Sequence, residues 1–280
     1  MTTDILLDGL CFGEGPRWHE GRLWLSDMHA HEVLAVSTDG EVETIVEIPN
    51  WPSGLGWLPN GDLLVVSMTD RCLLRYDGTN LTTHADLSGL ASFHCNDMVV
   101  AASGRAYVGN FGFDLQARAE FRPAELICVD PDGSARIVAE DLRFPNGSVI
   151  TPDGKTLIVG ETFGSRLTAF DIQANGNLEN RRVWAELPEG AVPDGICLDA
   201  ENGIWSASPA SNECIRQTEG GQVTHRVDVE QGAFACMLGG EEGNTLFILT
   251  SGSSDSEECP RQRSARVETF LAPYPHAGLP

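Results

Sequence analysis

The chain has 280 residues, including 30 glycines and 15 prolines, and 41% of its residues are hydrophobic. These values indicate a turn-rich globular protein, predicted here as one domain over residues 1–280 with a core large enough to need no disulfides. A formal net charge of -23 disfavours negatively charged partners, so neither nucleic acid nor a membrane surface is expected to bind.

Six short strand-forming runs recur along the chain, each just after a turn. The turns contain Gly, Asn-Gly or Asp-Gly and lie at residues 19–21, 59–61, 103–104, 152–154, 201–203 and 242–244. Such residues between apolar runs are typical of β-hairpins. The strands are expected at residues 22–26, 62–67, 106–109, 156–160, 203–207 and 245–250.

Further strands surround each of these hairpins. One precedes the turn, as at residues 148–151, a third follows, as at 167–171, and a fourth completes the unit. The repeat of roughly 40 to 50 residues is typical of a propeller blade. We therefore predict an all-β fold, a six-bladed β-propeller of four-stranded antiparallel blades. Residues 4–10 should close the ring by pairing with residues 267–271, and residues 251–264 should form an exposed loop.

Four short motifs precede or open the first strand of a blade. They are Gly-Glu-Gly-Pro at 13–16, Asn96-Asp97, Pro-Asn-Gly at 145–147 and Pro-Asp-Gly at 193–195. A propeller places the first strand of every blade innermost, so side chains at equivalent positions converge on one mouth. The sequence thus predicts a cluster of four oxygen-bearing side chains: Glu14, Asn96, Asn146 and Asp194.

Two carboxylates and two amides suit a single divalent cation. Calcium, magnesium or manganese would accept these oxygens, and zinc or iron(II) would do so with fewer ligands. The alternative is that Asn-Gly and Asp-Gly are ordinary turn dipeptides. Recurrence at equivalent positions, with a different oxygen donor in each blade, favours the cation site.

The same motifs resemble the SMP-30/gluconolactonase/LRE-like family of six-bladed propellers, which includes regucalcin and bacterial sugar lactonases. The resemblance spans essentially the whole chain and is carried by residues 13–18, Asn96-Asp97, residues 145–157 and Pro193-Asp194-Gly195. It implies that Glu14, Asn146 and Asp194 bind one divalent metal. It also implies that Asn96 contacts substrate or a metal-bound water, or acts as a fourth ligand as in related phosphotriesterases.

The expected activity is metal-dependent hydrolysis of a lactone. The cation would polarise the carbonyl, and a carboxylate would take a proton from the attacking water. Asp194 is our predicted base and Asp97 the second candidate. A serine mechanism is disfavoured because the chain lacks a G-x-S-x-G elbow. Phosphotriester hydrolysis at the same ion and a non-catalytic calcium- or ligand-binding propeller remain alternatives.

Two departures from the family bear on the substrate. Where sugar-lactone members tend to have an arginine, this chain has His94, and where they carry an acid it has Asn-Phe-Gly-Phe-Asp at 110–114. Both changes weaken the grip on a polyol, so a less hydroxylated or partly aromatic lactone is expected. Asn96, His94, Asp97 and Phe113 are the predicted substrate-binding residues, although core packing is an alternative role for Phe113.

The sequence leaves several roles open for the histidines, and it also bears on the cellular location of the protein. His94 could donate a hydrogen bond to substrate, shuttle a proton or be structural, whereas His29 and His31 are expected on a loop. The N-terminus has no signal-peptide pattern, and no apolar stretch reaches membrane-spanning length. We therefore expect a cytoplasmic protein, either a monomer or a small homo-oligomer.

Overall fold

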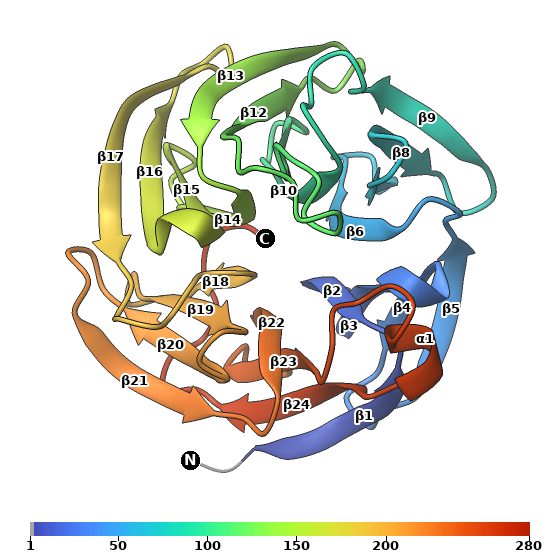
Figure 1. Cartoon of the computed structure of the whole chain (residues 1–280), viewed down its shortest axis with the longest axis vertical. Coiled ribbons are helices and arrows are strands. Elements are labelled where there is room, and N and C mark those ends of the chain that lie inside the picture. The colour runs from blue at the N-terminus through green and yellow to red at the C-terminus, as the bar shows by residue number, and fades with distance from the viewer. Residues whose placement is uncertain (1–2) are drawn as a thin grey trace.

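Six antiparallel sheets of four strands each surround a central axis in the computed structural model, which describes residues 3–280 (Figure 1). Blade 1 comprises β2 (Gly13–His19), β3 (Arg22–Asp27), β4 (Glu32–Val36) and β5 (Val42–Glu47). Blade 2 comprises β6 (Pro52–Trp57), β7 (Leu63–Ser67), β8 (Cys72–Tyr76) and β9 (Leu81–Asp86). Blade 3 comprises β10 (Cys95–Val100), β11 (Ala106–Asn110), β12 (Ala124–Val129) and β13 (Ala135–Leu142).

The second half of the ring repeats this arrangement. Blade 4 comprises β14 (Pro145–Ile150), β15 (Thr156–Glu161), β16 (Arg166–Ile172) and β17 (Leu178–Glu186). Blade 5 comprises β18 (Ile196–Leu198), β19 (Ile204–Ser208), β20 (Glu213–Gln217) and β21 (Val223–Asp228). Blade 6 comprises β22 (Gly232–Gly239), β23 (Thr245–Ser251), β24 (Ala265–Leu271) and β1 (Asp4–Leu10). The short helices are η1 (Met28–Ala30), η2 (Thr162–Gly164) and α1 (Cys259–Gln262). The predicted six-bladed propeller is confirmed.

The first strand of each blade lies innermost, as the repeat predicts. β2, β6, β10, β14, β18 and β22 contact one another around the axis. The ring closes where β1 pairs antiparallel with β24, with Leu10 opposite Ala265 and Asp4 opposite Thr269. This pairing completes the four-stranded sheet of blade 6 from the two ends of the chain.

Gly147 and Gly195, the glycines that follow Asn146 and Asp194, do not form turns. Asn146 and Gly147 lie inside β14, and neither Gly147 nor Gly195 has a positive φ. A Cβ on Gly147 would lie 2.5 Å from the Ile196 nitrogen, and one on Gly195 would lie 2.7 Å from the Ala235 Cα. The turn interpretation is therefore wrong: these positions need glycine because neighbouring inner strands approach too closely for a side chain.

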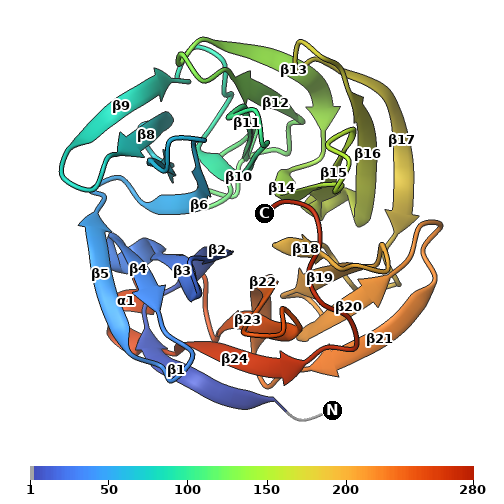
Figure 2. The ribbon, with the colours of Figure 1, turned by 180° about the vertical axis from the view of Figure 1, so that it is seen from behind.

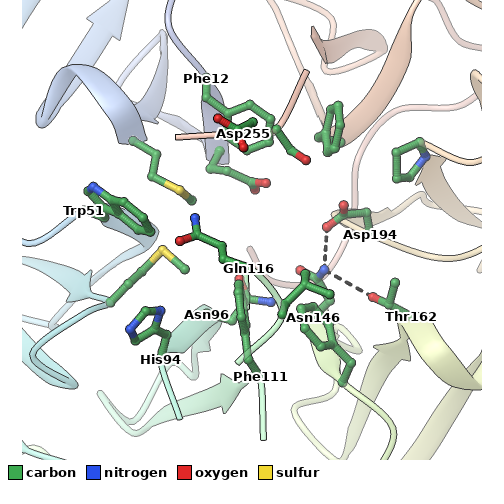
Figure 3. A pocket seen from close by; sticks show the side chains of 18 of the residues that line it. Phe12, Trp51, His94, Asn96, Phe111, Gln116, Asn146, Thr162, Asp194 and Asp255 are labelled. Carbon is green, nitrogen blue, oxygen red and sulfur yellow. Dashed lines mark hydrogen bonds between the residues drawn. The ribbon is translucent and has the colours of Figure 1, made fainter. Parts of the chain in front are cut away.

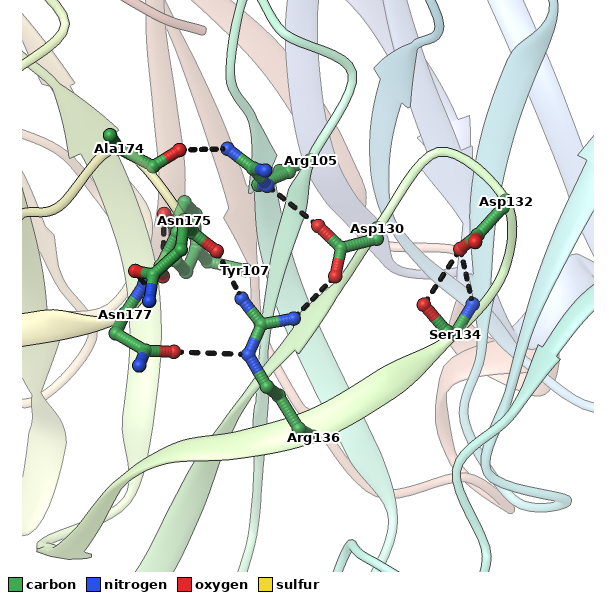
Figure 4. A network of polar contacts seen from close by, with 10 residues as sticks. Arg105, Tyr107, Asp130, Asp132, Ser134, Arg136, Ala174, Asn175 and Asn177 are labelled. Carbon is green, nitrogen blue, oxygen red and sulfur yellow. Dashed lines mark hydrogen bonds and ion pairs between the residues drawn. The ribbon is translucent and has the colours of Figure 1, made fainter.

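Blades 3 and 4 are joined by an ionic cluster around Asp130 (Figure 4). Arg105 Nε donates to Asp130 at 2.6 Å, and Arg136 pairs with the other carboxylate oxygen. Both arginines also bind the turn between β16 and β17: Arg105 donates to the Ala174 carbonyl at 3.0 Å and Arg136 to the Asn177 side chain at 3.0 Å. The hydrogen bond from Arg105 lowers the pKa of Asp130 below its usual range. This cluster fixes the blade 4 turn against blade 3.

Most of residues 251–264 are exposed, as predicted, but the segment also contains a short helix and a buried cysteine. It contains α1, and Cys259 is buried in the same apolar cluster as Phe12 and Met28. Cys259 thus anchors the segment against the end of blade 1, while most of its other side chains face solvent.

Residues after β24 run inward toward the axis across the face of the ring that lies opposite the starts of the inner strands (Figure 2). Leu279 and Ile150, the last residue of β14, exchange two backbone hydrogen bonds of 2.7 and 2.9 Å. Access to the axis is thus left at the mouth where the inner strands begin. None of the helices within residues 3–280 is both long enough and apolar enough to cross a membrane.

Candidate functional site

A pocket of about 410 Å³ opens at the mouth where the inner strands begin (Figure 3). Its volume lies within the range of roughly 300 to 1,000 Å³ that is typical of small-molecule sites. We call it the central pocket. Segments from all sides of the ring line it, including the loop after β11, η1, η2 and the segment before α1.

All four predicted oxygen-bearing side chains line this pocket. Glu14, Asn96 and Asn146 are each the second residue of an inner strand, and Asp194 lies two residues before β18. Strand pairing is irregular directly after the first three, which is typical of a β-bulge. Because bulges change the direction in which a side chain points, they account for these side chains facing the pocket. Each of the four is at most 8% exposed.

The two carboxylates carry strongly perturbed pKa values. Burial, reinforced by the negative charges of Asp194 and Asp97, raises the pKa of Glu14 well above its usual range. Burial likewise raises the pKa of Asp194 to about 8, against the opposing effect of a hydrogen bond from Asn146. Within residues 3–280 no Lys or Arg forms an ion pair with either carboxylate. Neither carboxylate therefore has an ion-pair partner in this part of the chain.

The amide of Asn146 has a fixed orientation. The Thr162 hydroxyl donates its only proton to the Pro193 carbonyl at 2.8 Å, so its oxygen can only accept from Asn146. Asn146 Nδ2 donates to that oxygen at 3.2 Å and to Asp194 Oδ1 at 2.5 Å (Figure 3). The carbonyl oxygen of Asn146 thus has no partner among these groups and is left for a ligand.

The donor set fits a divalent cation. Two buried carboxylates supply two negative charges, and the Asn146 and Asn96 amides supply neutral oxygens, as hard cations prefer. The Asn96 amide nitrogen donates to the Pro145 carbonyl at 3.4 Å, so the oxygen of this side chain is also free. Among residues 3–280 no cluster of three or more His, Cys, Asp or Glu side chains has metal-site geometry. A cation at this mouth would therefore depend on the asparagines.

Asp97 does not line the central pocket. Its carboxylate forms a buried ion pair of 2.7 Å with Arg17 and accepts the Met98 N–H at 2.8 Å. Arg17 also donates to the Leu55 carbonyl at 2.9 Å. Asp97 thus belongs to a contact between inner strands, β2, β6 and β10.

Of the other two predicted substrate-binding residues, His94 lines the central pocket and Phe113 does not. His94 lines the central pocket among aromatic rings, stacked on Phe93 at 4.1 Å and edge-on to Trp51 at 6.1 Å. Burial lowers the pKa of His94 below its usual value. Phe113 lies outside the central pocket, in an adjoining hollow that also contains Phe121 and Phe163.

Several pocket residues are absent from the sequence-based prediction. His29 lies in η1 between β3 and β4, where it is buried and lines the pocket, although the sequence predicted no site role for it. Thr162, Gln116 and Asp255 also line it, from η2, the loop after β11 and the segment before α1 (Figure 3). The signal for Thr162 was its place directly after the second strand of blade 4. Loops without periodic apolar residues gave no comparable signal for the others.

Comparison with known proteins agrees with this architecture. The model of the SMP-30/Gluconolactonase/LRE-like region matches residues 12–252. A pentonolactonase of Haloferax volcanii is 27% identical over 264 residues, covering 90% of this chain and 86% of that protein. Regucalcin of Gallus gallus is 27% identical over 286 residues and is covered to 95%, as is this chain. A solved gluconolactonase structure from Xanthomonas campestris has 26% identity and a TM-score of 0.75, covering 99% of this chain and 89% of its own.

The match to the family model extends over most of the chain, from the first residues of blade 1 to blade 6. It includes all four oxygen-bearing side chains at the pocket. The family resemblance expected from the sequence is thereby confirmed, and this chain belongs to the SMP-30/gluconolactonase/LRE-like family.

Proposed function

We propose that this protein is a metal-dependent lactone hydrolase whose cation is held by Glu14, Asn146, Asp194 and Asn96. The observation that carries the proposal is the pair of buried carboxylates that share one pocket with two oriented amides and have no basic partner. The expectation of an enzyme agrees with relatives named pentonolactonase and gluconolactonase. Calcium, zinc, manganese, magnesium and iron(II) all remain candidates for the cation, because oxygen donors discriminate poorly among them.

The chemistry divides between the cation and Asp194. A divalent ion, when bound, supplies the positive charge that polarises the ester carbonyl. Asp194 is held by Asn146 through one carboxylate oxygen, which leaves the second oxygen to accept a proton from water. As the water oxygen bonds to the carbonyl carbon and the ring C–O bond breaks, Asp194 passes this proton to the departing alkoxide. The product is a hydroxy acid.

Asp194 is better suited to this role than Asp97. Asp194 lines the pocket, whereas the Asp97 carboxylate is bound to Arg17 away from it. A carboxylate neutralised by a buried guanidinium is a weaker proton acceptor. Asn96 and His94 remain our proposed contacts to the substrate at the pocket wall.

The test starts from the purified full-length protein. Elemental analysis identifies the bound ion, and a panel of lactones is then followed by acid release with each candidate ion, after chelation and after metal return. We expect turnover that chelation abolishes and the metal restores. Tight metal binding without turnover of any lactone or phosphotriester would instead identify a binding protein. Faster hydrolysis of a phosphotriester than of every lactone would favour the phosphotriesterase alternative.

Thr162 should tune metal affinity without touching the ion. Thr162→Val removes the hydroxyl that orients the Asn146 amide, so the amide can rotate and present its nitrogen to the pocket. Loss of groups that orient a ligand typically weakens metal binding by about 10- to 100-fold, and we expect a change of this size in a calorimetric titration. Thr162→Ser keeps the hydroxyl and should bind the ion as the unmodified protein does. Equal affinity of the Val and Ser variants would contradict the role given to Thr162.

A further inference from the structure

A group of phenylalanines forms one wall of the central pocket and continues beyond its rim. The ring centroids of Phe111 and Phe144 are 4.4 Å apart, and those of Phe144 and Phe163 are 5.2 Å apart. Phe113 continues the group at 5.7 Å from Phe163. These rings come from the loop after β11, from the residue before β14 and from η2. The wall therefore lies where blades 3 and 4 meet.

A second hollow of about 410 Å³ adjoins the pocket at this wall. We call it the side groove; Phe113, Leu115, Phe121 and Phe163 form its apolar lining. Leu115 and Phe163 line both the side groove and the central pocket, so the two spaces adjoin at these side chains. Phe163 is 44% exposed and Leu115 40% exposed. Apolar side chains grouped in this way on a soluble protein mark a binding surface.

The charges around the pocket argue against an anionic substrate. Glu14, Asp194 and Asp255 line the central pocket, and no Lys or Arg of the described chain does so. Arg118 and Arg143 border only the side groove. With the cation bound, its charge offsets those of Glu14 and Asp194, so a sulfonate, phosphate or carboxylate away from the ion would meet the Asp255 carboxylate and no basic partner in the pocket.

A polyol would also bind weakly at the phenylalanine wall. Hydroxyl groups that leave water need hydrogen-bond partners, and each one buried without a partner is unfavourable. The Phe111, Phe144 and Phe163 rings offer none, whereas they provide the edge and face contacts that another aromatic ring prefers.

We infer that the central pocket takes an uncharged lactone whose ring carries an aromatic or aliphatic substituent, and that this substituent lies in the side groove against Phe163 and Leu115. The inference rests on the proposed lactone hydrolysis and specifies its substrate class. The phenylalanine wall would then select the substrate. Phe113 takes part although it lines only the side groove and not the central pocket.

Binding of lactams tests this without any need for turnover, because a lactam has the shape of a lactone and resists hydrolysis. The probes are 2-pyrrolidinone, 5-phenyl-2-pyrrolidinone and D-gluconolactam, titrated calorimetrically into the full-length protein in excess calcium and then in excess zinc. We expect the phenyl compound to bind at least about 10-fold more tightly than either other probe, since an aromatic contact adds that much to affinity.

Substitutions in the side groove test whether the preference for the phenyl probe arises there. Phe163→Ala should remove most of the 10-fold preference for the phenyl probe over 2-pyrrolidinone, and Leu115→Ala provides a second, independent change in the same groove. Leu271→Ala is the control, because Leu271 is 73% exposed at the end of β24 on the outside of the ring. An unchanged preference in both groove variants, or tighter binding of gluconolactam, would overturn the inference. A retained phenyl preference in a protein that hydrolyses no lactone would contradict the proposed function alone.

Discussion

Replacing Asp194 by Asn should lower kcat for lactone hydrolysis by about 1,000-fold, because a positioned general base typically contributes 10²- to 10⁴-fold. The variant keeps the size of the side chain but removes the proton acceptor. Its new amide would face Asn146, whose nitrogen already points at this position. Initial rates of acid release at saturating lactone measure the effect.

Loss of the cation would also lower activity, so Asp194→Asn must be compared with a control variant that removes a carboxylate but no proposed base. Glu14→Gln likewise removes one buried negative charge from the pocket, but Glu14 has no proposed role in proton transfer. In an excess of the ion, with occupancy verified by elemental analysis, Glu14→Gln should recover much more of its kcat than Asp194→Asn. Asp255→Asn, an acid at the outer wall of the same pocket, serves as a second comparison. Full turnover by metal-loaded Asp194→Asn would rule out Asp194 as the base.

The fold was accessible from the sequence because its repeating unit is local. Each hairpin carries turn residues that require a left-handed backbone, such as Gly61, Gly104 and Gly154, all of which have a positive φ. Once six such hairpins are counted, the geometry of a ring brings the starts of the inner strands together. The convergence of Glu14, Asn96, Asn146 and Asp194 on one pocket follows from that step and from no individual motif.

The prediction for Asp97 shows where sequence reasoning stopped too early. Successive side chains of a regular strand point to opposite faces, and although pairing is irregular beside Asn96, Asp97 points away from the pocket, toward Arg17. The alternation was visible in the sequence. The identity of the partner was not, because Arg17 lies 80 positions away in another blade.

The pocket wall was harder to predict than its floor. The floor residues occupy a repeated position, whereas the wall comes from single loops that differ between blades. Cys259 is one buried residue in a segment rich in Ser, Glu and Arg, and nothing periodic marks that segment as packed over η1. His29 and Asp255 thus became pocket residues only through tertiary contacts.

Arg17 holds three inner strands together, and its replacement should have the largest effect on stability. The guanidinium is 4% exposed and donates to the Asp97 carboxylate at 2.7 Å and to the Leu55 carbonyl at 2.9 Å. It also donates to the carbonyl of Met98. These contacts connect β2 with β6 and β10, and therefore blades 1, 2 and 3.

Arg17→Met should lower the free energy of unfolding by about 3 to 5 kcal/mol, since it leaves Asp97 buried and unpaired, and the carbonyls of Leu55, Pro16 and Met98 lose a donor. Equilibrium unfolding in urea, monitored by tryptophan fluorescence, measures the change. The double variant Arg17→Met with Asp97→Leu removes the unpaired charge and should regain part of the loss. Glu257→Gln breaks an ion pair whose partners are 71% and 85% exposed, and should leave the unfolding midpoint unchanged. If Arg17→Met unfolds at the same urea concentration as Glu257→Gln, this buried pair does not hold the inner strands together.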